Sequence, residues 1–316
     1  MASLKPELSV FAFILSPEPR DSWESVFEFI RAADRAGVDR AVMTGEHVVF
    51  GENLEAYADP KSGGRTGGKQ LTDPDGYYLD PFIAAATMFA TTKNIRLATN
   101  VILAPLRRPI VLAKTTTSLD VLSGGRLDLG VGVGWQKEEY VAAGVPFEKR
   151  GRLLDHALEV CKLLWTEKRA SYSSPELEFE NIHMMPKPVT PGGVPVWISG
   201  NLKPPVVRRL ARFGCGWLPW SEAGQDNAVL VEEIKLMREL VSREGRDPSD
   251  IQVSGMMPVV YDAAGQPLIG PTMEAVPALV EAGITEFRIR FPWPEDPAAA
   301  EDAMRKWVQA FREVTA

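Results

Sequence analysis

An adjacent carboxylate and imidazole, Glu46 and His47, form the pair in this sequence best suited to proton transfer. They follow residues 41–43, a short apolar run typical of a strand, so they stand where the chain leaves that strand. Imidazole changes its charge near neutral pH, and His47 can therefore take or give a proton. Three interpretations of His47 stay open: a catalytic or substrate contact, a cofactor contact, or a structural role. The other two histidines fall in a helix pattern (His156) and in a predicted hairpin (His183).

Three glycines, Gly130, Gly132 and Gly134, alternate along another predicted strand and are followed by Trp135. Residues two apart share one face of a strand, so the missing side chains leave room for a planar ring near the backbone. The same spacing suits a crowded interior, and it does not open a helix as a dinucleotide-binding motif does. Trp135 can stack on a substrate or a cofactor edge, or can simply fill the opening above the strand.

Small residues, Ser199, Gly200 and Asn201, end a further predicted strand just before a helix pattern. A small-residue turn into a helix presents free backbone N–H groups to an anion, and a cofactor phosphate is the candidate ligand. The helix that follows carries three arginines between 208 and 212, which we expect to face solvent rather than the anion.

The elements that must position these residues alternate between strand and helix patterns. Eight apolar runs are predicted strands: Leu8–Leu15, Ala41–Met43, Ile95–Leu103, Arg126–Gly132, Val194–Ser199, Gly216–Pro219, Ile251–Tyr261 and Glu286–Phe291. The helical patterns that follow them are Asp21–Ala36, Asp80–Thr92, Pro109–Leu122, Arg150–Trp165, Pro205–Phe213, Asn227–Arg243, Met273–Ala282 and Pro297–Val314. This order predicts an α/β fold, a (β/α)8 TIM barrel in a single domain covering residues 1–316. Such barrels build their active sites where the strands end.

Two stretches interrupt the alternation and explain why the chain, with 316 residues, exceeds the typical barrel of about 250. Residues 48–78, after the second strand, are rich in Gly, Asp and Pro and form a candidate lid; the alternative is a surface insertion. Residues 167–193, before the fifth strand, alternate apolar and acidic positions and predict a hairpin.

Composition limits the function classes. The chain has 35 basic and 42 acidic residues, a net charge of -7, which argues against a nucleic-acid partner and favours a small molecule. Two cysteines and three histidines, none in a metal-binding spacing, predict no metal site. No apolar stretch reaches the roughly 18 residues of a membrane helix and no leader pattern is visible, so we expect a cytoplasmic protein.

The segment from Leu119 to Trp135, LDVLSGGRLDLGVGVGW, resembles the luciferase-like monooxygenase superfamily, as do LATNVILAPLRRP before it and PVWISGN after it. Over residues 11–217 the chain is most similar to the branch of deazaflavin (coenzyme F420)-dependent oxidoreductases. The resemblance implies the same barrel, with the cofactor ring at the carboxyl-end mouth and commonly a homodimer. These motifs separate users of F420 from users of FMN poorly.

The resemblance also implies site residues. At Asn100 and Val101, family members have a non-proline cis peptide bond under the central cofactor ring; the alternative is an ordinary trans strand end. A Glu-His or Asp-His pair at the position of Glu46 and His47 lies beside cofactor and substrate in related enzymes. His47 would then handle the proton that accompanies hydride transfer, while Glu46 orients it or contacts the ring. Further cofactor contacts are implied at Gly134, Trp135, Ser199, Gly200 and Asn201.

The chain departs from family patterns at two positions. Trp135 stands where the similar glucose-6-phosphate dehydrogenases have a catalytic glutamate, which puts sugar-phosphate oxidation in doubt. Asn201 stands where the family usually has glycine, which makes the backbone geometry of the anion turn uncertain.

We therefore expect an oxidoreductase that transfers a hydride between coenzyme F420 and a small organic substrate. One alternative is an FMN-dependent monooxygenase, in which reduced flavin reacts with oxygen. Another is a non-catalytic flavin- or deazaflavin-binding protein. A metal-dependent barrel hydrolase is disfavoured because it needs His or carboxylate ligands at the ends of several strands.

Overall fold

Eight parallel strands close into a barrel in the computed structural model, which describes residues 4–61, 64–220, 224 and 226–316. The barrel strands are β1 (Glu7–Ala12), β3 (Arg40–Thr44), β5 (Arg96–Asn100), β7 (Leu127–Gly132), β10 (Val196–Gly200), β11 (Gly214–Pro219), β12 (Gln252–Met256) and β15 (Glu286–Ile289). Each pairs with the next in this order, and β15 pairs with β1 to close the ring. The predicted (β/α)8 barrel is confirmed.

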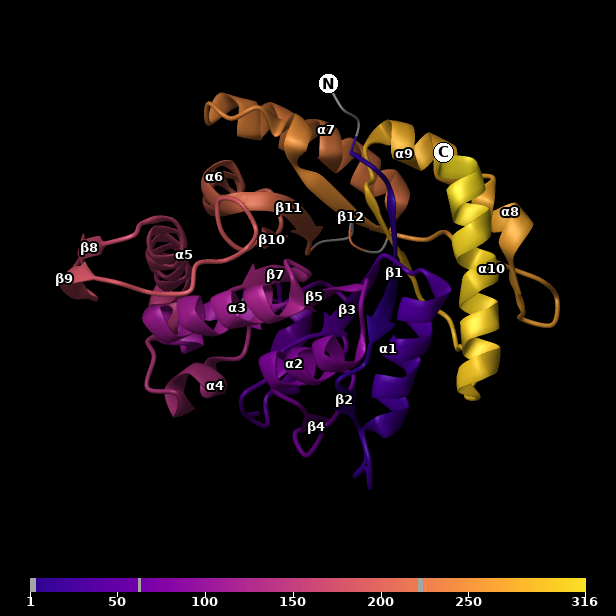
Figure 1. Cartoon of the computed structure of the whole chain (residues 1–316), viewed down its shortest axis with the longest axis horizontal. Helices are drawn as coiled ribbons and strands as arrows, with labels where there is room; N and C mark the ends of the chain where they lie inside the picture. Colours follow the sequence, from indigo (N-terminus) through magenta and orange to yellow (C-terminus); the bar gives the residue numbers. More distant parts are fainter. Residues whose placement is uncertain (1–3, 62–63, 221–223, 225) are drawn as a thin grey trace.

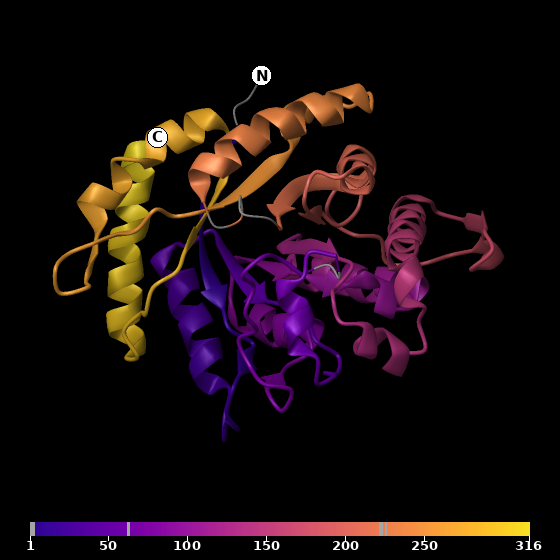
Figure 2. The same cartoon turned by 180° about the vertical axis from the view of Figure 1, so that it is seen from behind.

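Helices follow the barrel strands and cover the outside of the ring (Figure 1; Figure 2). They are α1 (Glu24–Ala36), α2 (Pro81–Thr91), α3 (Pro109–Ser123), α5 (Arg150–Thr166), α6 (Pro204–Phe213), α7 (Asn227–Arg243), α8 (Ile269–Met273), α9 (Val276–Ala282) and α10 (Pro297–Thr315). The helix predicted at 273–282 is thus divided into α8 and α9. None of the helices described is long and apolar enough to cross a membrane.

The remaining strands and one further helix are short. They are β2 (Leu15–Ser16), β4 (Tyr77–Tyr78), β6 (Ile102–Leu103), α4 (Lys137–Ala142), β8 (Ala170–Ser173), β9 (Glu178–Ile182), β13 (Val260–Tyr261) and β14 (Pro267–Leu268). The hairpin predicted between 167 and 193 is confirmed, because β8 and β9 pair antiparallel. Four predicted strands are shorter than expected: the first ends at Ala12, the third is interrupted at Val101, the seventh ends at Met256 and the eighth ends at Ile289.

Local chemistry explains where two of the helices begin and end. Asp80 accepts hydrogen bonds from the backbone N–H groups of Phe82 and Ile83, and Pro81 opens α2, so Asp80 caps this helix. Helix α3 ends at Gly124, whose φ of +68° is a conformation that favours glycine. Gly124 is therefore a structural turn residue.

The side chains that point into the barrel form a charged network at the start of the strands and line a cavity at the carboxyl ends. Side chains two residues apart share a face, so β3 directs Arg40, at its start, and Thr44, at its end, into the interior. Arg40 lies 2.9 Å from Asp128, 2.6 Å from Glu7 and 3.8 Å from Glu286, and we call these four residues the lower network. At the carboxyl ends of the strands the interior opens into a cavity instead.

Candidate active site

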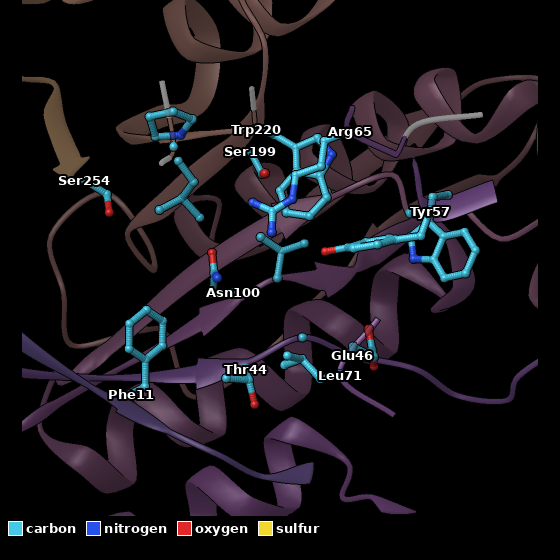
Figure 3. Close-up of a pocket in the computed structure, with 18 of the residues that line it drawn as sticks. Phe11, Thr44, Glu46, Tyr57, Arg65, Leu71, Asn100, Ser199, Trp220 and Ser254 are labelled. Atoms are coloured by element: carbon cyan, nitrogen blue, oxygen red, sulfur yellow. The ribbon is translucent and has the colours of Figure 1, made fainter. Parts of the chain in front are cut away.

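A cavity of about 300 Å³ lies at the carboxyl ends of the barrel strands (Figure 3). Much of its wall is apolar, as in typical small-molecule sites. The apolar lining contains Phe11, Phe13, Leu15, Tyr57, Tyr78, Val101, Leu103, Trp135 and Trp220. Active sites of (β/α)8 barrels form on this face, and the cavity is the candidate active site.

Most of the residues predicted from the sequence meet in this cavity. Those that line it are Glu46, His47, Asn100, Val101, Gly134, Trp135, Ser199 and Gly200. Asn201 lies outside the lining, because the chain turns away there: its backbone oxygen accepts the N–H group of Lys203 at 2.7 Å. The cofactor contact predicted for Asn201 stays a prediction, for a part of the ligand outside this lining.

The peptide bond between Asn100 and Val101 is cis, as the family resemblance implies, and the trans alternative is wrong. Both residues line the cavity directly after β5. The Val101 side chain lies over Gly132, where an added Cβ would come within 2.7 Å of Val101 Cγ2. A larger residue at Gly132 would displace the Val101 side chain.

The three alternating glycines of β7 and its carboxyl end differ in what surrounds them. A Cβ on Gly130 would lie 1.9 Å from the backbone oxygen of Thr99, so this glycine is needed for β5 and β7 to pack. Gly132 and Gly134 line the cavity, and Gly134 has a φ of +67°. Crowding therefore explains Gly130, and it applies to Gly132 as well, where Val101 occupies the space of a Cβ. The approach of a planar ring to Gly134 stays a prediction.

The insertion at 48–78 forms one wall of the cavity. Its last strand, β4, pairs with β2 and so attaches the insertion to the rim of the barrel. Tyr57 and Arg65 reach from the insertion into the cavity, and Gln70 and Leu71 also line it (Figure 3). This placement favours the lid interpretation over a surface insertion, while an opening motion stays a prediction.

Aromatic rings enclose the imidazole of His47, whose side chain is only 9% exposed. The imidazole stacks on Phe50, with ring centroids 4.0 Å apart, and meets Tyr78 and Trp135 edge-on at 5.3 and 5.8 Å. Trp135 therefore supports His47 and forms part of the cavity wall at the same time. The predicted stacking of this ring on a substrate or a cofactor edge stays a prediction.

The two ring nitrogens of His47 face groups from different elements. Nε2 lies 3.5 Å from Nε2 of Gln70, on the insertion. Nδ1 lies 3.5 Å from Oε2 of Glu139, a carboxylate whose side chain is 1% exposed. The other oxygen of Glu139 accepts the backbone N–H group of Val48 at 2.6 Å.

Glu139 is a site residue that the sequence patterns do not predict. It belongs to α4, which has only six residues and follows the glycine-rich strand, so helical periodicity cannot reveal it. The available signal is the acidic pair Glu138 and Glu139 shortly after a barrel strand ends, on the face where polar residues gather.

Of the two roles expected for Glu46, orienting His47 is wrong in this structure because the carboxylate is bound elsewhere, while contact with the cofactor ring stays a prediction. Its carboxylate accepts the N–H group of Leu103 at 2.6 Å and pairs with Arg107, whose Nε lies 3.1 Å away. Arg107 also lies 2.7 Å from Asp80, the N-cap of α2. Burial raises the pKa of Glu46, and Arg107 and the Leu103 N–H group only partly oppose this effect. Arg107 is less buried than Glu46, with 23% of its side chain exposed against 2%, and its charged form is favoured.

The turn at 199–201 is a weaker anion site than the sequence suggests. Helix α6 opens with Pro204 and Pro205, which lack backbone N–H groups and remove two of the donors that an anion needs. Arg209 is buried against Asp155 at 2.5 Å instead of facing solvent, which corrects the expectation for this arginine.

The remaining two arginines of this helix also point elsewhere. Arg212 pairs with Glu159 at 2.9 Å, and Arg208 is exposed, as predicted. None of the three arginines lines the described cavity. Among the described residues, no group of three or more His, Cys, Asp or Glu side chains is arranged to hold a metal ion.

Comparisons with known proteins agree with this geometry. An uncharacterized protein of Mycobacterium tuberculosis is 36% identical over 177 residues, which are 55% of this chain and 61% of the relative. An F420-dependent glucose-6-phosphate dehydrogenase of Kineococcus radiotolerans is 32% identical over 186 residues, 56% of this chain and 52% of the enzyme. The chain thus spans between half and two thirds of these relatives.

A solved structure shows the same fold, and a family profile matches nearly the whole chain. The structure of a monooxygenase from Streptomyces bottropensis has a TM-score of 0.73 and 18% identity, covering 98% of this chain and 100% of the other. The profile of the luciferase-like monooxygenases matches residues 8–310. The chain therefore belongs to the luciferase-like monooxygenase family.

Proposed function

We propose that this protein is an oxidoreductase that transfers a hydride between coenzyme F420 and a small organic substrate. The observation that carries the proposal is His47, a buried imidazole on the cavity wall whose Nε2 faces a second lining residue, Gln70. Reducing a carbonyl group, or oxidising an alcohol, moves a proton together with the hydride, and an imidazole can carry that proton. The similarity to an enzyme named as F420-dependent supports the choice of cofactor.

The residues present fit a planar ring system. Gly132 and Gly134 line the cavity, so a planar ring meets no side chain from either residue. The Thr44 hydroxyl is buried in the lining and has no hydrogen-bond partner among the described residues, so it is available to the polar edge of a ring. When bound, a deazaflavin donates or accepts the hydride.

The other lining residues shape the site. Glu46 joins the end of β3 to the backbone at Leu103 and so fixes the floor beside the Asn100 to Val101 turn. Burial raises the pKa of Tyr57, so its phenol stays a hydrogen-bond donor at the cavity wall. Trp135 occupies a wall position with a ring that cannot transfer a proton. We therefore propose a substrate other than a sugar phosphate.

Parallel titration of the purified apoprotein with F420 and with FMN tests the cofactor. We expect F420 to bind with a Kd of about 1 μM or lower and FMN to bind at least about tenfold more weakly. Tighter binding of FMN would overturn the proposal and favour an FMN-dependent monooxygenase, the activity in the family name. Tight binding without turnover of any carbonyl or alcohol would instead favour a cofactor carrier.

The Gly132→Ala variant checks that the ligand occupies this cavity. The added Cβ displaces Val101 toward the ligand, and we expect F420 affinity to fall about tenfold or more. Gly270→Ala is the control, because a Cβ there meets nothing within 4 Å. Equal affinities in both variants would place the cofactor elsewhere.

A further inference from the structure

We propose that Glu139 is a positioning residue that fixes the tautomer and the orientation of the His47 imidazole. Its functional meaning rests on the proton-transfer role proposed for His47, whereas its structural test does not. Nδ1 of His47 and Oε2 of Glu139 face one another at 3.5 Å, and neither has a hydrogen-bond partner among the described residues. Two complementary buried polar atoms without partners are costly, and a hydrogen bond between them satisfies both.

The separation is slightly too long for an ordinary hydrogen bond, whose limit is about 3.2 Å. Hydrogen bonds of catalytic groups are often long in ligand-free proteins and shorten in the complex. A shift of the imidazole by about 0.3 to 0.5 Å is enough to close this one. Ring contacts on Phe50, Tyr78 and Trp135 restrict the imidazole to movement of this small size.

The donors around the ring determine which nitrogen carries the proton. The Gln70 side-chain N–H group faces Nε2 of His47 and can only donate, so Nε2 must accept. The hydrogen of a neutral imidazole then lies on Nδ1, which faces the carboxylate of Glu139. This tautomer presents a basic Nε2 on the side of the lining residue Gln70, where a substrate proton would arrive.

Only one oxygen of Glu139 is available for this contact. Oε1 is held at 2.6 Å by the N–H group of Val48, the first residue of the insertion. Glu46 does not compete for His47, because its carboxylate is engaged by Leu103 and Arg107. Glu139 therefore links the start of the insertion to the imidazole, so that both keep one relative position.

Nitrogen NMR of the full-length protein labelled at histidine tests the proposal, since the chain has three histidines. The signals of His47 are assigned with His47→Asn, and the spectra are recorded in mildly alkaline buffer, where imidazole is neutral. We expect the wild-type protein to show the Nδ1–H tautomer at His47. In Glu139→Gln the amide oxygen stays with Val48, and its NH2 group faces Nδ1, which must then accept. We expect the ring to change to the Nε2–H tautomer while the Gln70 amide turns its carbonyl oxygen toward Nε2 to accept that hydrogen.

Two further variants make the test discriminating. Glu138→Gln, an exposed neighbour on the same helix, is the matched control and leaves the tautomer unchanged. Gln70→Met removes the donor at Nε2, and we expect the Nδ1–H tautomer to persist because Glu139 enforces it. An Nε2–H wild-type ring, an unchanged ring in Glu139→Gln, or a changed ring in Gln70→Met would each overturn the proposal. Gln70→Met also keeps the test valid if Glu139→Gln does not fold.

Turnover with F420 separates this proposal from the proposed function. We expect Glu139→Gln to lower kcat about 10²-fold while KM for F420 changes by less than about twofold. A full tautomer change with no activity in the wild type would contradict the F420 assignment and leave the positioning role standing. If Glu139→Gln changes the tautomer but leaves kcat undiminished, the positioning of His47 is irrelevant to the reaction. That result would overturn the functional meaning that we propose for Glu139.

Discussion

Two charged regions of the barrel differ in how closely their charges approach one another, although each contains buried atoms without a hydrogen bond. These atoms are Arg40 Nη1 and Glu7 Oε2 in the lower network, and His47 Nδ1 and Glu139 Oε2 at the mouth. In the lower network, Arg40 has three carboxylates at 3.8 Å or less. At the mouth, Glu46 and Arg107 form a comparable closed pair. Beside them, His47 and Glu139 remain at 3.5 Å with unpartnered atoms.

We interpret the buried charges of the lower network as structural, and the contact between His47 and Glu139 as one that serves chemistry. The lower network is flanked by two more arginines, Arg96 on Asp128 and Arg288 on Glu286, so the charges of this end of the barrel are balanced. A balanced and largely buried network has little reason to change its protonation. An open contact beside a cavity leaves one nitrogen free to exchange a proton. The mouth thus keeps one longer contact at the position of the proton transfer that we propose.

The largest expected effect comes from breaking the lower network. Arg40→Met leaves Asp128, Glu7 and Glu286 without their shared cation, and we expect the free energy of unfolding to fall by about 3–5 kcal/mol. Urea denaturation measures this loss. Arg35→Met is the control: its partner Glu301 is also a carboxylate, but Arg35 is 49% exposed, so the loss should stay below about 1 kcal/mol. Similar losses in both variants would show that burial of the network adds nothing.

The second prediction concerns the open pair. His47→Ala should lower turnover by about 10²- to 10⁴-fold, because the proton carrier is lost. Affinity for F420 should change by less than about tenfold, or 1.4 kcal/mol. Steady-state kinetics and a fluorescence titration measure the two quantities. If cofactor binding is abolished while the bound fraction turns over normally, His47 is a cofactor clamp and its assigned role is wrong.

The fold was predictable because its signals are local. Each barrel strand is a short apolar run, and the helices carry signals such as the Asp80 cap and Gly124. The lower network was not predictable, because Arg40 and Asp128 interrupt strand patterns and their contact depends on barrel closure. A charged residue in a strand gives no sign of the partner that it meets across a barrel.

Those site residues were predictable whose position follows from the barrel topology alone. Parallel strands end on one face, so Glu46, His47 and Ser199 had to gather there. The cis bond at Asn100 came from the family resemblance, since nothing in the residue types predicts it. Which carboxylate lies beside His47 depends on the directions of the side chains. Glu46 was expected there because it is adjacent in sequence, but in the fold Glu139 is the carboxylate that faces the imidazole.

The smallest expected effect concerns how protein stability depends on pH. A carboxyl group of the lower network and one at the mouth should contribute to this dependence with opposite signs. Burial alone would raise the pKa of Asp128, but Arg40 and Arg96 lower it below its ordinary value of 3.8. Its contribution to stability is therefore present above about pH 3.8 and is lost as pH falls through the lowered pKa. For Glu46, burial prevails over Arg107 and raises the pKa above 4.5. Its contribution is present below pH 4.5 and is lost as pH rises through the raised pKa.

Asp128→Asn and Glu46→Gln should consequently diverge. Acidification below about pH 4 should narrow the stability gap between the wild-type protein and Asp128→Asn, because the wild-type protein alone loses the ionised carboxylate. A rise in pH above about 4.5 should cost the wild-type protein stability relative to Glu46→Gln, because only the wild-type carboxyl must ionise in its buried position. We expect changes of about 1 kcal/mol in each case, measured by urea denaturation at a series of pH values. Slopes of the same sign in both variants would mean that the mouth pair is as fully compensated as the lower network, and the contrast between the two regions would then rest on His47 and Glu139 alone.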